Sequence, residues 1–165
     1  VPRDDKTAVK WYRLAAEQGN AIAQTNLGVM YSKGQGVPRD DKIAVKWWKL
    51  SANQGVASAQ YNLGVMYRKG QGVPRDDKIA VKWYRLAAEQ GDTDAQYFLG
   101  LMYALGEGVK QDSVYAHMWG NISASNGSEN GGKMRDIVAK DMTPADISKS
   151  QDLTRECVRK KYKGC

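Results

Sequence analysis

The sequence predicts an all-α protein, a solenoid of antiparallel helix pairs with a period of 36 residues and about nine helices. Two observations lead to this prediction. The hexapeptide Val-Pro-Arg-Asp-Asp-Lys opens at Val1, Val37 and Val73, and most columns of the three copies that follow are identical. Each copy also contains two stretches with helical periodicity, separated by glycine. Stacked repeats of this kind share one core and form an extended surface.

The composition is that of an ordinary globular protein. The chain has 165 residues, of which 42% are hydrophobic and 26% charged. No apolar run approaches the roughly 18 residues that span a bilayer. The net charge of +7 favours anionic partners without locating a site for them. We expect a single solenoid domain over residues 1–165, with repeats over 1–127, the last degenerate, and capping helices over 128–165.

The central copy shows where each helix is expected to begin and end. The first helix should run from about Asp40 to Gln54, because acidic residues favour the positive end of a helix and Gly55 suits a left-handed C-terminal position. The second should run from about Ala57 to Lys69 and stop at the pair Gly70 and Gly72. A Val-Pro pair follows, and proline disfavours helical conformation in the residue before it.

The second helix of each copy has one invariant face and one variable face. The invariant face contains a mid-helix glycine, Gly28, Gly64 or Gly100, each costing about 1 kcal/mol relative to alanine. We therefore expect a neighbouring helix to approach closely at these glycines. The variable columns form the opposite, free face, which in the first copy carries Thr25, Asn26, Val29 and Ser32.

The chain carries the pattern A-x-A-Q-x-x-L-G-x-M-Y-x-x-G-x-G-V followed by D-x-x-x-A-V-K-W. In the central copy its positions are Ala59, Gln60, Leu63, Gly64, Met66, Tyr67, Gly70, Gly72, Val73, Ala80 and Trp83. This pattern resembles the Sel-like repeat (SLR) family of bacterial proteins, a tetratricopeptide-related α-solenoid. The resemblance covers essentially residues 1–127, and residues 112–126 read as a degenerate last copy that keeps Ala116 and Trp119.

The resemblance implies a right-handed solenoid and an adaptor role between proteins. Residues 128–141 and 143–162 read as two further helices that resemble the terminal segment of bacterial members. In tetratricopeptide-like arrays the second helix of each repeat lines the concave side, so we expect a peptide or protein partner there, with aromatic and arginine anchors. The expected binding residues are Tyr61, Asn62, Val65, Arg68, Tyr97, Phe98 and Leu101. Alternatively, Phe98 and Leu105 merely pack against the degenerate final repeat.

The sequence argues against catalysis. Nucleophilic or metal enzymes need convergent His, Cys or carboxylate groups, but the chain has one histidine, His117, and two cysteines that follow the repeats. His117 lies beside the pattern positions Ala116 and Trp119, which favours a packing or solvent-facing role. The pair Asp40 and Asp41 recurs in every full copy, which suits helix capping. We therefore expect no catalytic residue, no metal site and no cofactor.

Nucleic-acid or anionic-surface binding is the alternative function. Lys42, Lys46 and Lys49 fall on one polar face of the first helix, and the other copies repeat them. The equivalent residues are Lys6, Lys10, Arg13, Lys78, Lys82 and Arg85. We call this predicted row of cations the basic ridge. It lacks interleaved exposed aromatics, on which single-stranded bases would stack, so nucleic acid is the weaker prediction.

The first helix, expected over residues 4–18, begins in the middle of a family repeat. We interpret this as N-terminal trimming or processing. Its apolar edge at Ala8, Trp11 and Ala15 should then be covered by another molecule, including a second copy of the chain, or favour aggregation.

Cys157 and Cys165 are the only cysteines. An unbroken helix would separate their Cα atoms by about 12 Å, beyond the roughly 4.4–6.8 Å that a disulfide tolerates. Gly164 can reverse the chain, so we expect the last helix to end near Tyr162 and the tail to fold back and join the two cysteines. Such a bond favours a periplasmic or secreted protein; free thiols in a cytoplasmic protein are the alternative.

Overall fold

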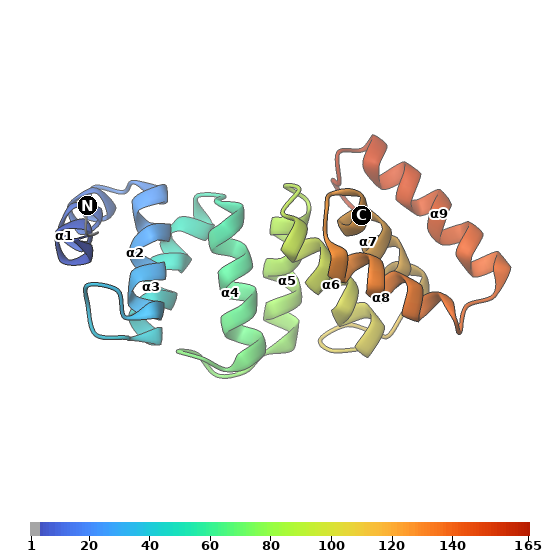
Figure 1. The fold of residues 1–165 in the computed structure, drawn as a ribbon, viewed down its shortest axis with the longest axis horizontal. Helices are drawn as coiled ribbons and strands as arrows, with labels where there is room; N and C mark the ends of the chain where they lie inside the picture. The colour runs from blue at the N-terminus through green and yellow to red at the C-terminus, as the bar shows by residue number, and fades with distance from the viewer. Residues whose placement is uncertain (1–3) are drawn as a thin grey trace. The chain divides into compact units, whose positions relative to one another are not determined.

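The computed structural model describes residues 4–165 and forms two compact units within them (Figure 1). The first three residues, which hold the first Val-Pro-Arg, lie outside the described part. Unit 1 ends at Asp76 and unit 2 runs from Asp77 to Cys165. A single domain over the whole chain stays a prediction.

Residues 4–165 contain nine helices and no strand, as predicted. Unit 1 holds α1 (Asp5–Glu17), α2 (Ala21–Lys33), α3 (Asp41–Asn53) and α4 (Ala57–Lys69). Unit 2 holds α5 (Asp77–Ala88), α6 (Thr93–Leu105), α7 (Ser113–Ser125), α8 (Glu129–Ala139) and α9 (Pro144–Arg159). The observed bounds of the repeat helices lie within a residue or two of the predicted ones.

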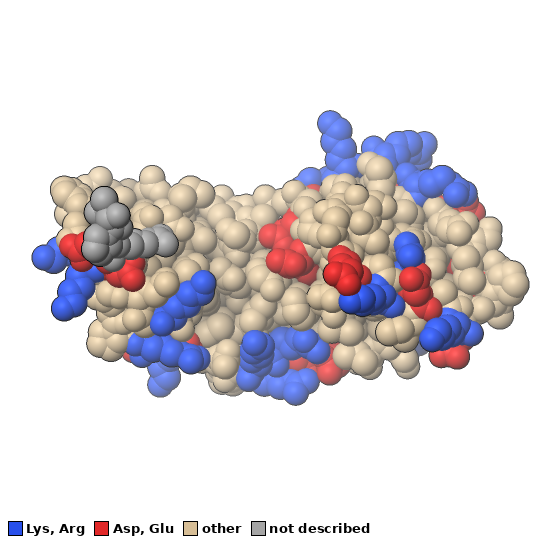
Figure 2. Space-filling view, in the orientation of Figure 1, with Lys and Arg blue, Asp and Glu red and all other residues tan. Residues whose placement is uncertain are grey.

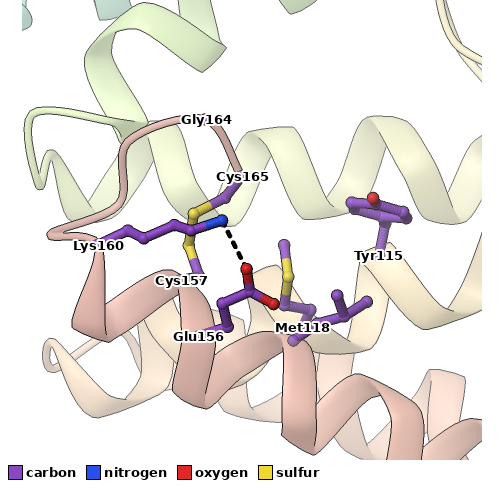
Figure 3. Close-up of a pocket in the computed structure, with 8 residues that line it drawn as sticks. Tyr115, Met118, Glu156, Cys157, Lys160, Gly164 and Cys165 are labelled. Carbon is purple, nitrogen blue, oxygen red and sulfur yellow. Dashed lines mark ion pairs between the residues drawn. A yellow bond between two sulfur atoms is a disulfide. The ribbon is translucent and has the colours of Figure 1, made fainter.

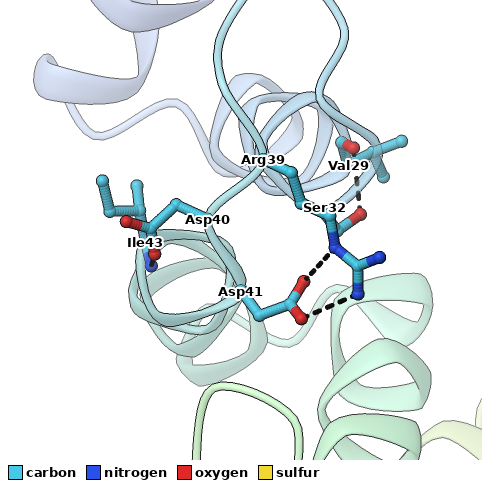
Figure 4. Close-up of polar contacts among 6 residues, drawn as sticks. All are labelled: Val29, Ser32, Arg39, Asp40, Asp41 and Ile43. Atoms are coloured by element: carbon cyan, nitrogen blue, oxygen red, sulfur yellow. Dashed lines mark hydrogen bonds and ion pairs between the residues drawn. The ribbon is translucent and has the colours of Figure 1, made fainter.

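The first aspartate of each pair caps the first helix, α1 or α3, in unit 1, in line with the predicted capping. The Asp40 side chain accepts a hydrogen bond from the Ile43 amide at 2.9 Å, and so satisfies one of the free N–H groups at the start of α3. Asp41 lies in the first turn and faces the other way, where Arg39 donates two hydrogen bonds to its carboxylate at 2.8 and 3.2 Å (Figure 4). The two acidic groups therefore have separate structural roles.

The two glycines after each second helix also have separate roles. Gly34 and Gly70 end α2 and α4 in the left-handed conformation, at φ of 67° and 66°. Gly36 and Gly72 also have positive φ, and a Cβ on either would lie 2.5 Å from the carbonyl carbon of Asp5 or Asp41. The loop after the second helix therefore rests against the first turn of its partner helix, and only glycine fits there.

Mid-helix glycines allow close helix packing in both units. A Cβ on Gly28 would lie 2.5 Å from Nε1 of Trp48, which donates to the Thr25 carbonyl at 3.1 Å. A Cβ on Gly100 would lie 2.6 Å from Cε of Met134 on α8 and 3.1 Å from Cβ of Trp119 on α7. The predicted close approach is confirmed at both positions, although the neighbour differs.

The invariant glutamine joins the two helices of each repeat. Gln24, Gln60 and Gln96 are buried, and each Nε2 donates to a carbonyl near the end of the preceding helix at 3.1 to 3.2 Å. Neighbouring turns also contact these amides. Gln54 donates to Oε1 of Gln24, and Asn126 donates to Oε1 of Gln96, both at 2.8 Å.

One residue expected on the free face of the second helices is buried. Thr25 is only 7% exposed, and its hydroxyl is 2.7 Å from Oγ of Ser51 on α3. The prediction for Thr25 was wrong because Trp48 bonds the Thr25 carbonyl and draws α3 over this short side chain. Asn26, Val29 and Ser32 remain half-buried on α2.

The Gly72 contact predicts unequal effects of two glycine substitutions. Gly55 also has positive φ, at 91°, but a Cβ there would meet nothing within 4 Å. G55A should therefore lower the unfolding free energy by only about 1 kcal/mol, because alanine adopts the left-handed conformation less readily than glycine. G72A adds a clash with backbone and should lose about 3 kcal/mol. Urea unfolding followed by circular dichroism measures both, and equal losses would contradict the proposed contact.

Candidate partner-binding site

An open groove lies between α6 and α8 in unit 2, with a volume of about 420 Å³. We call it the α6–α8 groove. From α6 it is lined by Tyr97, Leu101, Ala104 and Leu105. From α8 and the turn after it the groove is lined by Asn130, Lys133, Met134, Ile137, Val138 and Asp141, and Gln111 and the first residue of α7, Ser113, complete it. The lining is therefore mainly apolar, with two charged groups.

Two large apolar side chains of the groove remain exposed. Leu105 is 53% and Ile137 is 63% exposed, whereas the neighbouring Met134 is buried. The last helix, α9, packs on α7 and leaves the groove open to solvent. Side chains of this size exposed together are typical of interaction sites.

The structure places two of the predicted binding residues, Tyr97 and Leu101, in the α6–α8 groove. Phe98 instead packs within unit 2: its ring stacks on Tyr84 of α5, with centroids 5.4 Å apart. The edge of Tyr97 meets Phe98 with centroids 5.0 Å apart. Phe98 therefore packs between Tyr84 and Tyr97 and contacts the ring of Tyr97. Leu105, which the alternative had packed against the final repeat, is about half exposed.

The other four predicted binding residues belong to unit 1. Tyr61, Asn62, Val65 and Arg68 are half-buried on α4, with the spacing of one helical face. Sequence reasoning missed the residues of α8, because this helix departs from the repeat pattern. Its apolar residues Met134, Ile137 and Val138 at helical spacing were the available signal.

In each repeat, the third cation of the basic ridge has a tyrosine partner. Arg13 donates to the Tyr31 hydroxyl at 2.6 Å, and Arg85 donates to the Tyr103 hydroxyl at 2.7 Å. In the central copy Lys49 lies over the ring of Tyr67, 5.6 Å from its centroid. These pairs explain the invariant tyrosine, which sequence reasoning had assigned only to packing.

The three ridge lysines of α3 border a shallow hollow in unit 1. It has a volume of about 470 Å³, and Lys42, Lys46 and Lys49 surround Val45, Leu50 and Val73. Figure 2 shows Lys and Arg side chains along the lower edge of the view and over the C-terminal end of α9. No acidic residue lines the hollow, so it presents a local positive charge.

The lone histidine has a structural role. His117 is buried on α7, and its Nδ1 lies 2.7 Å from Oγ of Ser150 on α9 and 3.1 Å from Nδ2 of Asn121. Burial lowers the pKa of His117, and the nearby Arg135 lowers it further, so the neutral ring is favoured. Within residues 4–165 no cluster of three or more His, Cys, Asp or Glu is placed to hold a metal ion. No helix of this part has the length and hydrophobicity that a membrane span requires.

The C-terminal tail folds back and forms a disulfide between Cys157 and Cys165, whose Cα atoms are 5.6 Å apart (Figure 3). The bond borders a small pocket of about 220 Å³. Tyr115 and Met118 of α7 line one side, and the ion pair between Glu156 and Lys160 lines the other. The hydrogen bond from Lys160 lowers the pKa of Glu156.

The tail reverses earlier than predicted. The last helix ends at Arg159, not near Tyr162, and Lys161 and Tyr162 have positive φ of 51° and 67° ahead of Gly164. Two contacts offset the cost of this conformation. The Tyr162 amide donates to the Cys157 carbonyl at 2.9 Å, and the Tyr162 hydroxyl donates to Oδ1 of Asn126 at 3.3 Å. The second contact lies too far along the chain for local sequence to reveal it.

The Sel1 repeat matches the chain four times, over residues 1–20, 21–56, 57–92 and 93–128. The chain belongs to the Sel1 repeat family. This result confirms the resemblance seen in the sequence, and Sel1 repeat proteins are generally non-enzymatic scaffolds for protein interactions. No curated protein matched the chain in a separate comparison.

Solved structures of Sel1 repeat proteins share the fold. A protective antigen of uropathogenic Escherichia coli, c5321, has a TM-score of 0.87 and 36% identity over 93% of this chain. This chain spans only 33% of that protein. A Sel1 repeat protein from Oxalobacter formigenes has a TM-score of 0.69 and 36% identity, covering 76% of this chain and 94% of its own. Cysteine rich protein B of Helicobacter pylori, at 21% identity and a TM-score of 0.63, covers 79% of this chain and 94% of its own. The predicted fold class, a right-handed Sel1-type α-solenoid, is confirmed.

In the Sel1 frame α6 opens the last matched repeat, and α8 begins at Glu129, one period of 36 residues after Thr93. The α6–α8 groove therefore lies between helices in equivalent positions of successive periods. The family match ends at residue 128, so α8 has kept the position of a repeat helix without its sequence.

Loss of the disulfide should loosen the tail. Removing the bond with C165S should lower the unfolding free energy by about 2 to 3 kcal/mol, because the short loop is no longer closed in the unfolded chain. The control K163S keeps both cysteines. Intact mass after alkylation without reduction should show no modified cysteine in the native sequence. Two freely alkylated thiols in native protein would contradict the bond.

Proposed function

We propose that this Sel1 repeat chain is a non-catalytic scaffold that binds a peptide or protein partner on the concave side of its repeats. The observation that supports this most is the apolar α6–α8 groove, which contains two of the residues expected to bind, Tyr97 and Leu101. Its volume of about 420 Å³ is in the range of sites that take ligand side chains.

The chemistry of the groove suits a protein surface better than a substrate. Most of its lining consists of aliphatic, aromatic and thioether side chains, and its charged groups are Lys133 and Asp141. No pair of titratable groups within the lining is arranged as an acid and a base, and one lysine already pairs with Glu129 at 2.5 Å. Burial of exposed Leu105 and Ile137 against a partner would supply the main stabilisation.

We also propose a role for α4 of unit 1. Tyr61, Asn62, Val65 and Arg68 occupy one face of this helix, and tyrosine and arginine are frequent among residues that dominate binding energy. They would give unit 1 a contact surface of its own for a partner.

Binding of an anionic partner is a second candidate function. It is supported by the hollow on α3, where Lys42, Lys46 and Lys49 surround apolar side chains with no acidic residue in the lining. The half-buried Tyr31 and Tyr67 are paired with the cations Arg13 and Lys49. This favours a peptide or surface over stacked bases.

We propose a periplasmic or secreted location, with a cytoplasmic one as the alternative. The disulfide of the tail is compatible with an oxidising compartment. Self-association through α1 is a related proposal, because Trp11 is 69% and Leu14 is 53% exposed on that helix, while Ala8 and Ala15 are half-buried.

The partner site can be tested with the double variant Tyr61→Ala and Tyr97→Ala. The partner is first captured from extracts of the source cell by the immobilised chain and then purified for calorimetry. We expect the double variant to weaken binding by at least about tenfold, since buried aromatic anchors carry much of the affinity of an interface. The variant V158A, on the exposed side of α9, is the control. Unchanged affinity in the double variant would contradict the proposed site.

The anionic candidate predicts salt-sensitive binding through α3. Labelled mixed-sequence RNA and DNA are titrated with the chain at low and physiological salt. If the candidate is correct, affinity falls steeply with salt and is lost in K42Q/K46Q. The control K140Q/K149Q removes the same charge from exposed positions on unit 2. Absence of saturable binding at low salt, or equal loss in both variants, would exclude nucleic acid as the partner of the hollow.

A further inference from the structure

We infer that the α6–α8 groove accepts one amphipathic α-helix of about three turns, supplied by the partner and carrying a basic residue at one end. This inference rests on the proposed function and adds the shape and charge of the partner segment.

The lining residues of both helices follow helical stripes. On α8 they fall at 130, 133, 134, 137 and 138, with 141 in the turn after the helix, and on α6 at 97, 101, 104 and 105. Spacings of three and four place each set on one face of its helix. The side chains of α6 and α8 therefore form two rows along the α6–α8 groove. A third helix can pack its own side chains between these rows.

The walls favour a helix over an extended peptide. They consist mainly of helices, whose backbone groups are already bonded within each helix, and residues 4–165 contain no strand with an open edge. Gln111, one of the few amides in the lining, already donates to the Ala104 carbonyl at 2.9 Å. An extended peptide would therefore bury backbone groups without partners, whereas a helix satisfies its own.

The length follows from the stripe on α8. On this helix the lining runs from Asn130 to Val138, eight steps or about 12 Å at the helical rise, and Asp141 in the following turn extends it. Together they match about three turns of a bound helix. Met134 lies at the middle of the stripe, and its flexible thioether lets the floor adapt to different apolar side chains.

Two charged residues of the lining indicate the partner's polarity. Lys133 lies on α8 beside Met134, and Asp141 lies in the turn that follows this helix. Glu129 compensates Lys133 at 2.5 Å, whereas Asp141 has no ion pair within the described residues. Asp141 is therefore the stronger determinant, and it selects a Lys or Arg at the adjacent end of the bound helix.

The test uses labelled synthetic peptides of about fourteen residues, long enough as helices to fill the groove. They are titrated with the whole chain, and binding is followed by fluorescence anisotropy. Each has apolar residues at i, i+3 and i+7, Glu in its first turn and Lys in its last. Leu, Ile, Met or Phe fills the apolar positions in a panel of four. A second panel places proline at the centre, which prevents helix formation without changing the net charge.

We expect saturable binding by at least one helical peptide, and about tenfold or greater weakening by I137D, which puts a charge in the apolar stripe. The control V158D adds the same charge at an exposed residue of α9 outside the groove and should bind normally. D141K should weaken binding of the original peptide, and a peptide with Glu in place of the terminal Lys residues should recover it.

Three results would overturn the inference. The first is no binding by any helical peptide. The second is equal binding by the proline panel; if I137D abolishes that binding, the groove remains a partner site, and only the helical occupant is wrong. The third is self-association of the chain that I137D removes, because a second copy would then fill the groove.

Discussion

The arrangement of each repeat depends on one backbone contact. Gly36 and Gly72 bring the loop after the second helix against the carbonyl at the start of its partner helix, where a side chain would collide with the main chain. The same contact recurs in unit 2 between Gly108 and Asp77. Because this contact fixes one helix of the pair against the other, it also decides which side of the second helix can face a partner.

The repeated sequence made the fold unusually predictable. Three copies served as a comparison within one chain, so fixed columns such as the Gly-x-Gly loop and the capping Asp40 revealed helix ends and packing faces. The same approach failed at Thr25, since its burial depends on how Trp48 of the next helix bonds the backbone. Pairs between cations and tyrosines, such as Arg13 with Tyr31, were also missed because their members lie on different helices.

The candidate site was only half predictable. Tyr97 and Leu101 follow from the repeat pattern, but the opposite wall comes from α8, whose sequence no longer follows it. Met134 of α8 also contacts the mid-helix glycine Gly100 together with Trp119, whereas the nearest atoms at Gly28 all belong to Trp48. The end of the array therefore combines a standard helix with a divergent one, and this combination leaves Leu105 and Ile137 open to solvent. The reversal at Lys161 and Tyr162 depends on a distant contact with Asn126 and could not be read from the tail alone.

In each unit a buried glutamine and an exposed amide on the neighbouring turn form a short relay rather than isolated bonds. In unit 1 Gln54 donates to Gln24, which donates to the Ala16 carbonyl; in unit 2 Asn126 donates to Gln96, which donates to the Ala88 carbonyl. Gln24 and Gln96 each accept one of these hydrogen bonds and donate another, so the amide dipoles of each relay align head to tail and polarise one another. The energetic effect of one glutamine is consequently shared with the neighbouring repeat. Cooperativity in this solenoid is thus carried by polar groups as well as by the apolar core.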